Sequence, residues 1–293
     1  MANFLVDHDR MATGCHVQPA DTRAGMVKYT GPRIKESDYE STDALRPYVP
    51  LGLCQASVPA CCEFATIKAY MTKFHVTTGK PSVPLSICAS YQENVNGDFT
   101  SGDAPMHSLR SLATKGAYPV VDGLPVWFDR PRSVPADAVA RRHLFRADEF
   151  EDCQEAADLI SAILNMDPTN IGIDWYDTDV NPGPTGHLLV RGNRVVGGHS
   201  LTGCGIVMNY RPSPSGHGIL FNNHHGDKLT PTQHDERGNT FTFPVWGDDG
   251  FGVMPIERAV AGMPKYGAFA LRSVFVPDAI LSDVPTPNFS SAA

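Results

Sequence analysis

The sequence has no run of about 18 apolar residues, the length that a helix needs to cross a bilayer. Its first residues, MANFLVDHDRMATG, have no basic stretch followed by an apolar stretch, which is the pattern of a secretory signal. We therefore expect neither membrane insertion nor secretion by the usual route. A cytoplasmic location follows as the default.

Positive charge is also scarce. The chain has 24 basic and 32 acidic side chains, a net charge of -8, and these charges are scattered rather than grouped. Proteins that bind nucleic acid or anionic membranes carry basic patches, so neither partner is expected. With 293 residues, 42% of them apolar, the chain can form one large domain or two lobes that share a cleft.

A disulfide framework is not expected either. The seven cysteines are an odd number without a repeated spacing, in a chain long enough to be stable without cross-links. Free thiols in a reducing compartment are the favoured interpretation.

Metal-binding spacings are missing as well. Cys54, Cys61 and Cys62 have no second Cys/His pair with a CxxC-like spacing, so a zinc or redox fragment is a minor alternative. Four histidines near two acids match no established ligand pattern, and we expect no metal and no cofactor there. These residues are His217, His224, His225, His234, Asp227 and Asp235.

Helical patterns come early in the chain. Apolar residues recur at helical spacing from Cys62 to about residue 74, so a helix of some 14 residues should follow the loop QASVPA. A second helix is expected in APMHSLRSLATKGAYP, where Gly116 and Pro119 supply the stop signal. A third is expected in DEFEDCQEAADLISAILNM, with acids in its first turn.

Strand patterns come late. The β-favouring runs are NIGIDWYDTDV, GHLLVRGNRVVGGHSLTGCGIVMNY, GHGILFNN, NTFTFPVW and YGAFALRSVFVP. Helices followed by strands predict an α+β protein, a helical lobe packed on an antiparallel sheet or barrel lobe. We divide the chain into an N-terminal extension (1–42), a helical lobe (43–145) and a β-rich lobe (146–293).

The chemistry of the site begins with Cys61. It lies at the start of the first expected helix, where unpaired N–H groups and the helix dipole favour a thiolate. A histidine must then act as base and a polar group must orient it. His199 follows two glycines in a β run, and Asn222 and Asn223 end a later apolar strand. Taken alone, each is equally compatible with a structural role.

In this order the three residues and their surroundings resemble the papain family of cysteine peptidases, in particular its bacterial and phage-like members. The matching segments are DALRPYVP, QASVPACCEFA, PLSICASYQENVNGD, SGDAPMHSLRSLATKGAYP, GGHSLTGCGIVMN, LFNNHHG and WGDDGFGVMPIE. The resemblance implies a two-lobe fold with the active site in the cleft between the lobes. It makes Cys61 the nucleophile, His199 the base, Asn223 its orienting partner and Gln55 the oxyanion-hole side chain. By the same resemblance, the substrate-binding residues are Gly198, Ser86 and Trp246.

The sequence departs from the family at two places that bear on catalysis. Glu63 lies two residues after the nucleophile, and a carboxylate that pointed toward the thiol would raise its pKa. His225 replaces the tryptophan that shields the His–Asn pair from water, so we expect a less shielded bond.

The expected function is hydrolysis of peptide or isopeptide bonds in a polypeptide substrate. Two alternatives remain open. One is a catalytically weak papain-fold component of a large assembly, such as a virion, with other assembly proteins as partners. The other is a cell-wall amidase or peptidoglycan hydrolase that uses the same nucleophile.

Overall fold

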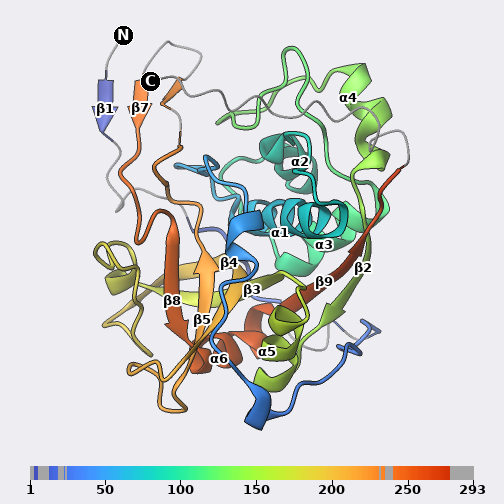
Figure 1. Ribbon diagram of the computed structural model, residues 1–293. Coiled ribbons are helices and arrows are strands. Elements are labelled where there is room, and N and C mark those ends of the chain that lie inside the picture. Colours follow the sequence, from blue (N-terminus) through green and yellow to red (C-terminus); the bar gives the residue numbers. More distant parts are fainter. Residues whose placement is uncertain are drawn as a thin grey trace.

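The computed structural model describes residues 3–5, 13–18, 23, 25–230, 232–234 and 240–277. Four helices, α1 to α4, occur before residue 145 and gather in the upper half of the molecule (Figure 1). They are α1 (Cys61–Thr78), α2 (Ile87–Asn94), α3 (Pro105–Thr114) and α4 (Ala136–Arg141), with short 3-10 turns at Glu36–Asp38, Arg46–Tyr48 and Arg142–Leu144.

A six-stranded sheet occupies the second half of the chain. Its strand order is β2-β9-β3-β4-β5-β8, and every neighbouring pair is antiparallel. The strands are β2 (Ala147–Asp152), β3 (Thr169–Tyr176), β4 (Val195–Met208), β5 (His217–Asn222), β8 (Phe251–Pro255) and β9 (Ala268–Val274). A small separate sheet joins β1 (Asn3–Leu5), β7 (Thr240–Thr242) and β6 (Gln233–His234), with β1 parallel to β7.

Helix α1 is longer than the sequence predicted, with 18 residues, and ends at Gly79 in the left-handed conformation. Its first ten residues are all buried, because it contacts strands β3, β4 and β9 as well as α2 and α3. An amphipathic surface helix would show one apolar stripe, whereas a helix buried all round is a core element. The start of α1 is therefore held on several sides.

The third predicted helix is wrong in its first part. Residues Ala147–Asp152 form strand β2, paired with β9, and only Ala156–Leu164 form a helix, α5. The acids that we assigned to a first helical turn have tertiary partners instead. Glu151 accepts hydrogen bonds from the backbone and hydroxyl of Thr30 and pairs with Arg272. Local sequence does not reveal such partners.

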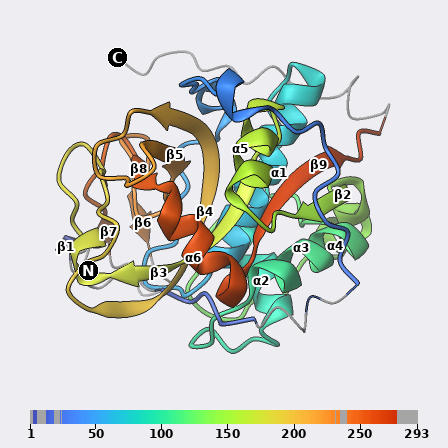
Figure 2. The ribbon, with the colours of Figure 1, turned by 90° about the horizontal axis from the view of Figure 1, so that it is seen from below.

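Helix α6 (Ile256–Tyr266) was not predicted. It follows β8 directly and packs mainly on β3. Viewed from below, α5 and α6 lie between the β5–β8 edge and the β2–β9 edge of the sheet (Figure 2). Gly262 permits this packing, because a Cβ there would lie 2.1 Å from the carbonyl oxygen of Gly172 on β3.

Two large hydrophobic clusters make up most of the core. One lies around α5, α6 and the central strands; the other lies around α1 to α4. The second cluster also takes in Ala147, Leu271 and Val274 from β2 and β9. The α+β class with an antiparallel sheet is confirmed. The division at residues 145 and 146 stays a prediction, because β2 and β9 pack with the helices.

Candidate active site

The structure brings Cys61 and His199 together. Cys61 is the first residue of α1 and His199 lies in β4, and both side chains are 0% exposed. Strand β4 makes extensive contact with α1, which carries the histidine to the start of the helix. The two side chains interact by hydrogen bonding and by charge.

The Asn223 side chain orients the His199 ring. Its Oδ1 lies 2.9 Å from Nε2 of His199 and also accepts the backbone N–H of His224. This leaves Nδ1 of His199, which has no other hydrogen-bond partner, as the ring nitrogen for the thiol. Asn222 has a different task, since its Nδ2 donates to the carbonyl of Gly250. Of the two asparagines, Asn223 is the one that the geometry places at the ring.

The His199 ring is better shielded than we expected. Trp175 on β3 has its ring centroid 4.5 Å from that of His199, and His225 and His224 lie at 4.7 and 4.9 Å. Ile173 is the residue opposite His199 in the sheet, so Trp175 is its diagonal neighbour, within reach of a large side chain. The expected loss of shielding is therefore wrong, because another strand supplies the tryptophan. The sequence signal was an aromatic residue two positions from Ile173, the residue that pairs with His199. To recognise this signal, the strand register must be known.

The acidity of the Cys61 thiol follows from its neighbours. Burial acts to raise its pKa, but hydrogen bonds with Cys62 and His199, the charge of His199 and the backbone N–H of Gly14 outweigh burial. The pKa of Cys61 therefore lies well below its ordinary value. Burial raises the pKa of Cys54 to about 12, and it raises the pKa of Cys62 well above the usual value, with further contributions from Cys15 and Cys61. None of the seven cysteines forms a disulfide, and all seven are buried. Only Cys61 among these three combines a lowered pKa with a histidine neighbour.

Gln55 lies in the loop before α1. Its backbone N–H donates to the carbonyl of His224 at 2.9 Å, and its side-chain Nε2 donates to the carbonyl of Val58 at 3.1 Å. The Nε1 of Trp127 donates to the Gln55 carbonyl. These bonds fix the loop next to the segment that carries Asn223. The first N–H groups of a helix have no partner within the helix, so the N–H of Cys61 and the Gln55 amide are suitable donors for an oxyanion.

The segment 13–18, here called the strap, covers the thiol. Its backbone bonds to both sides of the cleft: Cys15 N donates to Gly198 O (3.0 Å), and Gly14 O accepts from Asp103 N (2.8 Å). His16 N donates to Asp103 O (2.8 Å) and Gln18 N to Lys265 O (2.5 Å). A Cβ on Gly14 would lie only 2.1 Å from the Pro59 carbonyl oxygen. The strap is therefore held between Gly198 and Asp103 with Gly14 next to Cys61, and it fits there only with glycine at position 14.

The three predicted substrate-binding residues have different surroundings. The Gly198 carbonyl accepts a hydrogen bond from Cys15 of the strap. Trp246 is fully buried behind Trp175, at a ring distance of 6.0 Å. Ser86 bonds to the carbonyls of Pro125 and Tyr118, rather than to Cys61 or His199. A role in substrate binding stays a prediction for all three.

Lys68 is a residue of the site that the sequence analysis missed. Its fully buried Nζ donates to Asn222 Oδ1 at 2.6 Å and to the Asn223 carbonyl at 3.0 Å. Burial lowers its pKa to about 8. Lys68 thus joins the helix of Cys61 to the strand end that carries Asn223. The signal in the sequence was a lysine four residues after Phe64, within a stretch of the helix where most residues are apolar.

Glu63 is turned into a polar cluster of its own. Its Oε1 accepts hydrogen bonds from Asn94 Nδ2 (2.5 Å) and Ser108 Oγ (2.8 Å), and Ser108 also donates to Asp103. Burial and the neighbouring Asp103 raise the pKa of Glu63 well above its usual value. Glu63 therefore keeps its proton to a higher pH than an ordinary carboxyl group, and its hydrogen bonds turn it toward Asn94 and Ser108.

The raised pKa of Glu63 predicts a pH-dependent stability. Above the ordinary carboxyl pKa, the folded protein keeps a proton that the unfolded chain loses, so the free energy of unfolding falls as pH rises. The slope is about 1.4 kcal/mol per pH unit until the raised pKa is reached. We expect Glu63→Gln to remove this slope and to be more stable than the wild type at pH 8. Urea unfolding at pH 5, 6.5 and 8 measures it.

The exposed Glu36 gives the matched control. Glu36→Gln should have the same pH dependence as the wild type. Parallel curves for Glu63→Gln and the wild type would contradict the assignment of a protonated Glu63.

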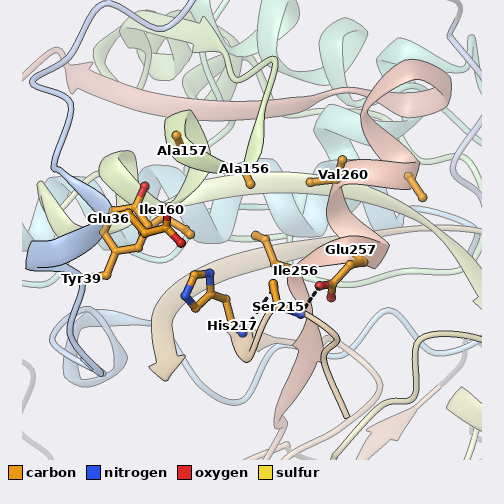
Figure 3. Close-up of a pocket in the computed structure, with 11 residues that line it drawn as sticks. Glu36, Tyr39, Ala156, Ala157, Ile160, Ser215, His217, Ile256, Glu257 and Val260 are labelled. Carbon is orange, nitrogen blue, oxygen red and sulfur yellow. Dashed lines mark hydrogen bonds between the residues drawn. The ribbon is translucent and has the colours of Figure 1, made fainter. Parts of the chain in front are cut away.

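A surface pocket elsewhere contains none of the candidate residues. It has a volume of about 480 Å³ and lies between α5, α6 and the start of β5 (Figure 3). Glu257, at its edge, accepts hydrogen bonds from Ser213 and Ser215.

Within the described residues, no group of three or more His, Cys, Asp or Glu side chains is arranged to hold a metal ion. Among the helices of that same part of the chain, none is long and apolar enough to cross a membrane.

Comparisons with solved structures agree with the fold. Xylellain, a cysteine protease from Xylella fastidiosa, superposes with a TM-score of 0.62 at 13% identity, over 90% of this chain and 97% of xylellain. ProCathepsin B S9 from Trypanosoma congolense gives 0.61 at 15% identity, over 91% and 88%. The clostridial cysteine protease Cwp84 gives 0.61 at 14%, over 80% and 57%. No model of a known protein family matches the sequence, and no curated protein matches it. The chain thus has the fold of papain-like cysteine proteases.

Proposed function

We propose that this protein is a papain-like cysteine peptidase that hydrolyses peptide or isopeptide bonds in polypeptides. The observation that carries the proposal is the alignment of Cys61, His199 and Asn223, with a lowered thiol pKa at the start of a buried helix. A structural cysteine in an apolar core is expected to have a raised pKa, as Cys54 and Cys88 do. The fold neighbours support the general class of reaction.

The mechanism follows from the geometry. His199 takes the proton of Cys61, and the thiolate attacks the carbonyl carbon of the substrate. The oxyanion accepts hydrogen bonds from the Cys61 backbone N–H and the Gln55 amide. The imidazolium then gives its proton to the leaving amine, and His199 activates the water that hydrolyses the thioester. Asn223 holds the ring in place by accepting from Nε2 throughout.

In the conformation described here the enzyme is latent. The strap occupies the position over Cys61 and uses the Gly198 carbonyl. A substrate must therefore displace residues 13–18 before it reaches the thiol. A latent enzyme keeps all its catalytic residues in place beneath the strap. Because Cys61, His199 and Asn223 lie together there, the alternative of an inactive assembly component has less support.

Selective alkylation tests the proposal. At pH 6.5 we expect iodoacetamide to label Cys61 at least about tenfold faster than Cys62 or Cys54, because only the thiolate reacts. Peptide mass spectrometry after timed quenching measures the three rates. The His199→Gln variant is the matched control and should lose the selectivity, because it removes the charge that stabilises the thiolate. Equal slow labelling of all three cysteines would overturn the proposal.

A further inference from the structure

Three thiols meet at the cleft. Cys15 comes from the strap, and Cys61 and Cys62 come from the start of α1; together with Tyr266 they form one buried cluster. The Cys62 thiol interacts with both of the others, and its Sγ lies 3.1 Å from the Asp103 carbonyl oxygen. The proposed mechanism uses only Cys61. The positions of the other two thiols need a separate explanation.

The backbone holds Cys15 in this cluster. Its N–H bonds to Gly198, and its neighbours Gly14 and His16 both bond to Asp103. Glycines give the space that the strap and its neighbour Tyr266 need: a Cβ on Gly198 would lie 2.2 Å from the Cys15 carbonyl oxygen, and one on Gly172 would lie 2.2 Å from the Cβ of Tyr266. The Cys15 thiol is thereby held against the α1 cysteines across 46 residues of sequence.

The three thiols differ in reactivity. Cys61 has the lowered pKa described above, whereas burial raises the pKa of both Cys15 and Cys62. A thiolate attacks peroxides, and a neighbouring thiol then resolves the sulfenic acid. The Cys62 thiol hydrogen-bonds to that of Cys61, but it is poorly placed to form a disulfide with it, because consecutive Cα atoms are only about 3.8 Å apart and a disulfide needs about 4.4 Å or more. Cys15 has no such restriction.

We propose that Cys15 is the resolving thiol of a redox latch that ties the strap to the nucleophile. A small hydroperoxide enters when the strap opens briefly. The Cys61 thiolate attacks its outer oxygen, the O–O bond breaks, and Cys61 sulfenic acid and an alcohol (water from hydrogen peroxide) form after one proton is taken up. When the strap closes, the Cys15 sulfur attacks the Cys61 sulfur, an S–S bond forms and water leaves.

The electrons balance over these two reaction steps. Two thiols lose two electrons in total, and the peroxide gains them. A thiol reductant reverses the bond by exchange. The oxidised protein is then covalently latent, and its Cys61 is protected from further oxidation to the irreversible sulfinic acid. The reduced protein keeps only the hydrogen-bonded strap, which a substrate can displace.

The test uses the full chain, reduced and desalted, then treated with a few equivalents of hydrogen peroxide. We expect non-reducing peptide mapping to show the Cys15 peptide joined to the Cys61 peptide, and dithiothreitol to separate them. The link should form in Cys62→Ser and be missing in Cys61→Ser, which identifies the sulfur involved. In Cys15→Ser, Cys61 should instead accumulate as sulfenic acid, trapped by dimedone.

The readout does not depend on peptidase activity. The latch rests on the proposed function only in taking Cys61 as a thiolate. A link that forms in an inactive protein would refute the peptidase and leave the latch standing. An active peptidase without the link, or with a link that survives Cys61→Ser, would overturn the latch.

Discussion

We expect replacement of Cys61 by serine to lower kcat/KM for peptide hydrolysis by at least about 1000-fold. A serine hydroxyl is not ionised at neutral pH, so the stabilisation that Cys62, His199 and the N–H of Gly14 give to the thiolate has no anion to act on. The fold should persist, because oxygen is smaller than sulfur and the site tolerates the loss of volume. Initial rates on quenched fluorescent peptides from a casein digest measure the effect.

The adjacent cysteine provides the control. Cys62→Ser keeps a donor for the Asp103 carbonyl, which Cys62 Sγ contacts at 3.1 Å, and should retain most of the activity. Circular dichroism of both variants must match the wild type for the comparison to hold. Equal losses of kcat/KM in the two variants would mean that Cys61 and Cys62 have only a structural role.

Opening the strap should have the opposite effect. We expect Gly14→Leu to raise kcat/KM at least about tenfold, because the side chain cannot fit beside the Pro59 carbonyl and the closed state is destabilised. If the protein can bind substrate only in the small fraction of molecules whose strap is open, its activity rises in proportion to that fraction. A chain that begins at residue 19 should show the same gain. The same fluorescent peptides measure both.

Val17 supplies the matched control within the strap. Its side chain is 61% exposed, so Val17→Ala should leave the closed state and the rate unchanged. If Gly14→Leu is folded and no more active than the wild type, the strap does not limit access to the thiol.

Local patterns predicted the elements that local chemistry dictates. Helix α3 ends where Gly116, in the left-handed conformation, follows it, and β3 and β9 coincide with runs of β-favouring residues. Helix α1, with Cys61 at its start, was predicted for the same reason. Apolar spacing and helix-end signals act within a few residues, so one sequence is enough to detect them.

What the sequence did not predict depends on distant partners. Strand β2 is acidic, but β9 and the bonds of Glu151 make it a strand. Trp175 reaches His199 only through the register of β3 on β4. The strap has no periodicity, since its structure comes from pairing with Asp103 and Gly198. Each of these depends on residues more than 20 positions away in the sequence.

The buried Lys68 has a consequence for how the cleft can move. Its amine is fully buried, so separating α1 from the end of β5 would leave a cation without the oxygens of Asn222 and Asn223. Leaving a buried charge unpaired costs several kcal/mol, which makes hinge opening between the two walls of the cleft unfavourable. Substrate admission is then a gating step, in which the walls stay fixed and the chain over the nucleophile moves. The groups of the proposed active site are in this respect already assembled in the resting state.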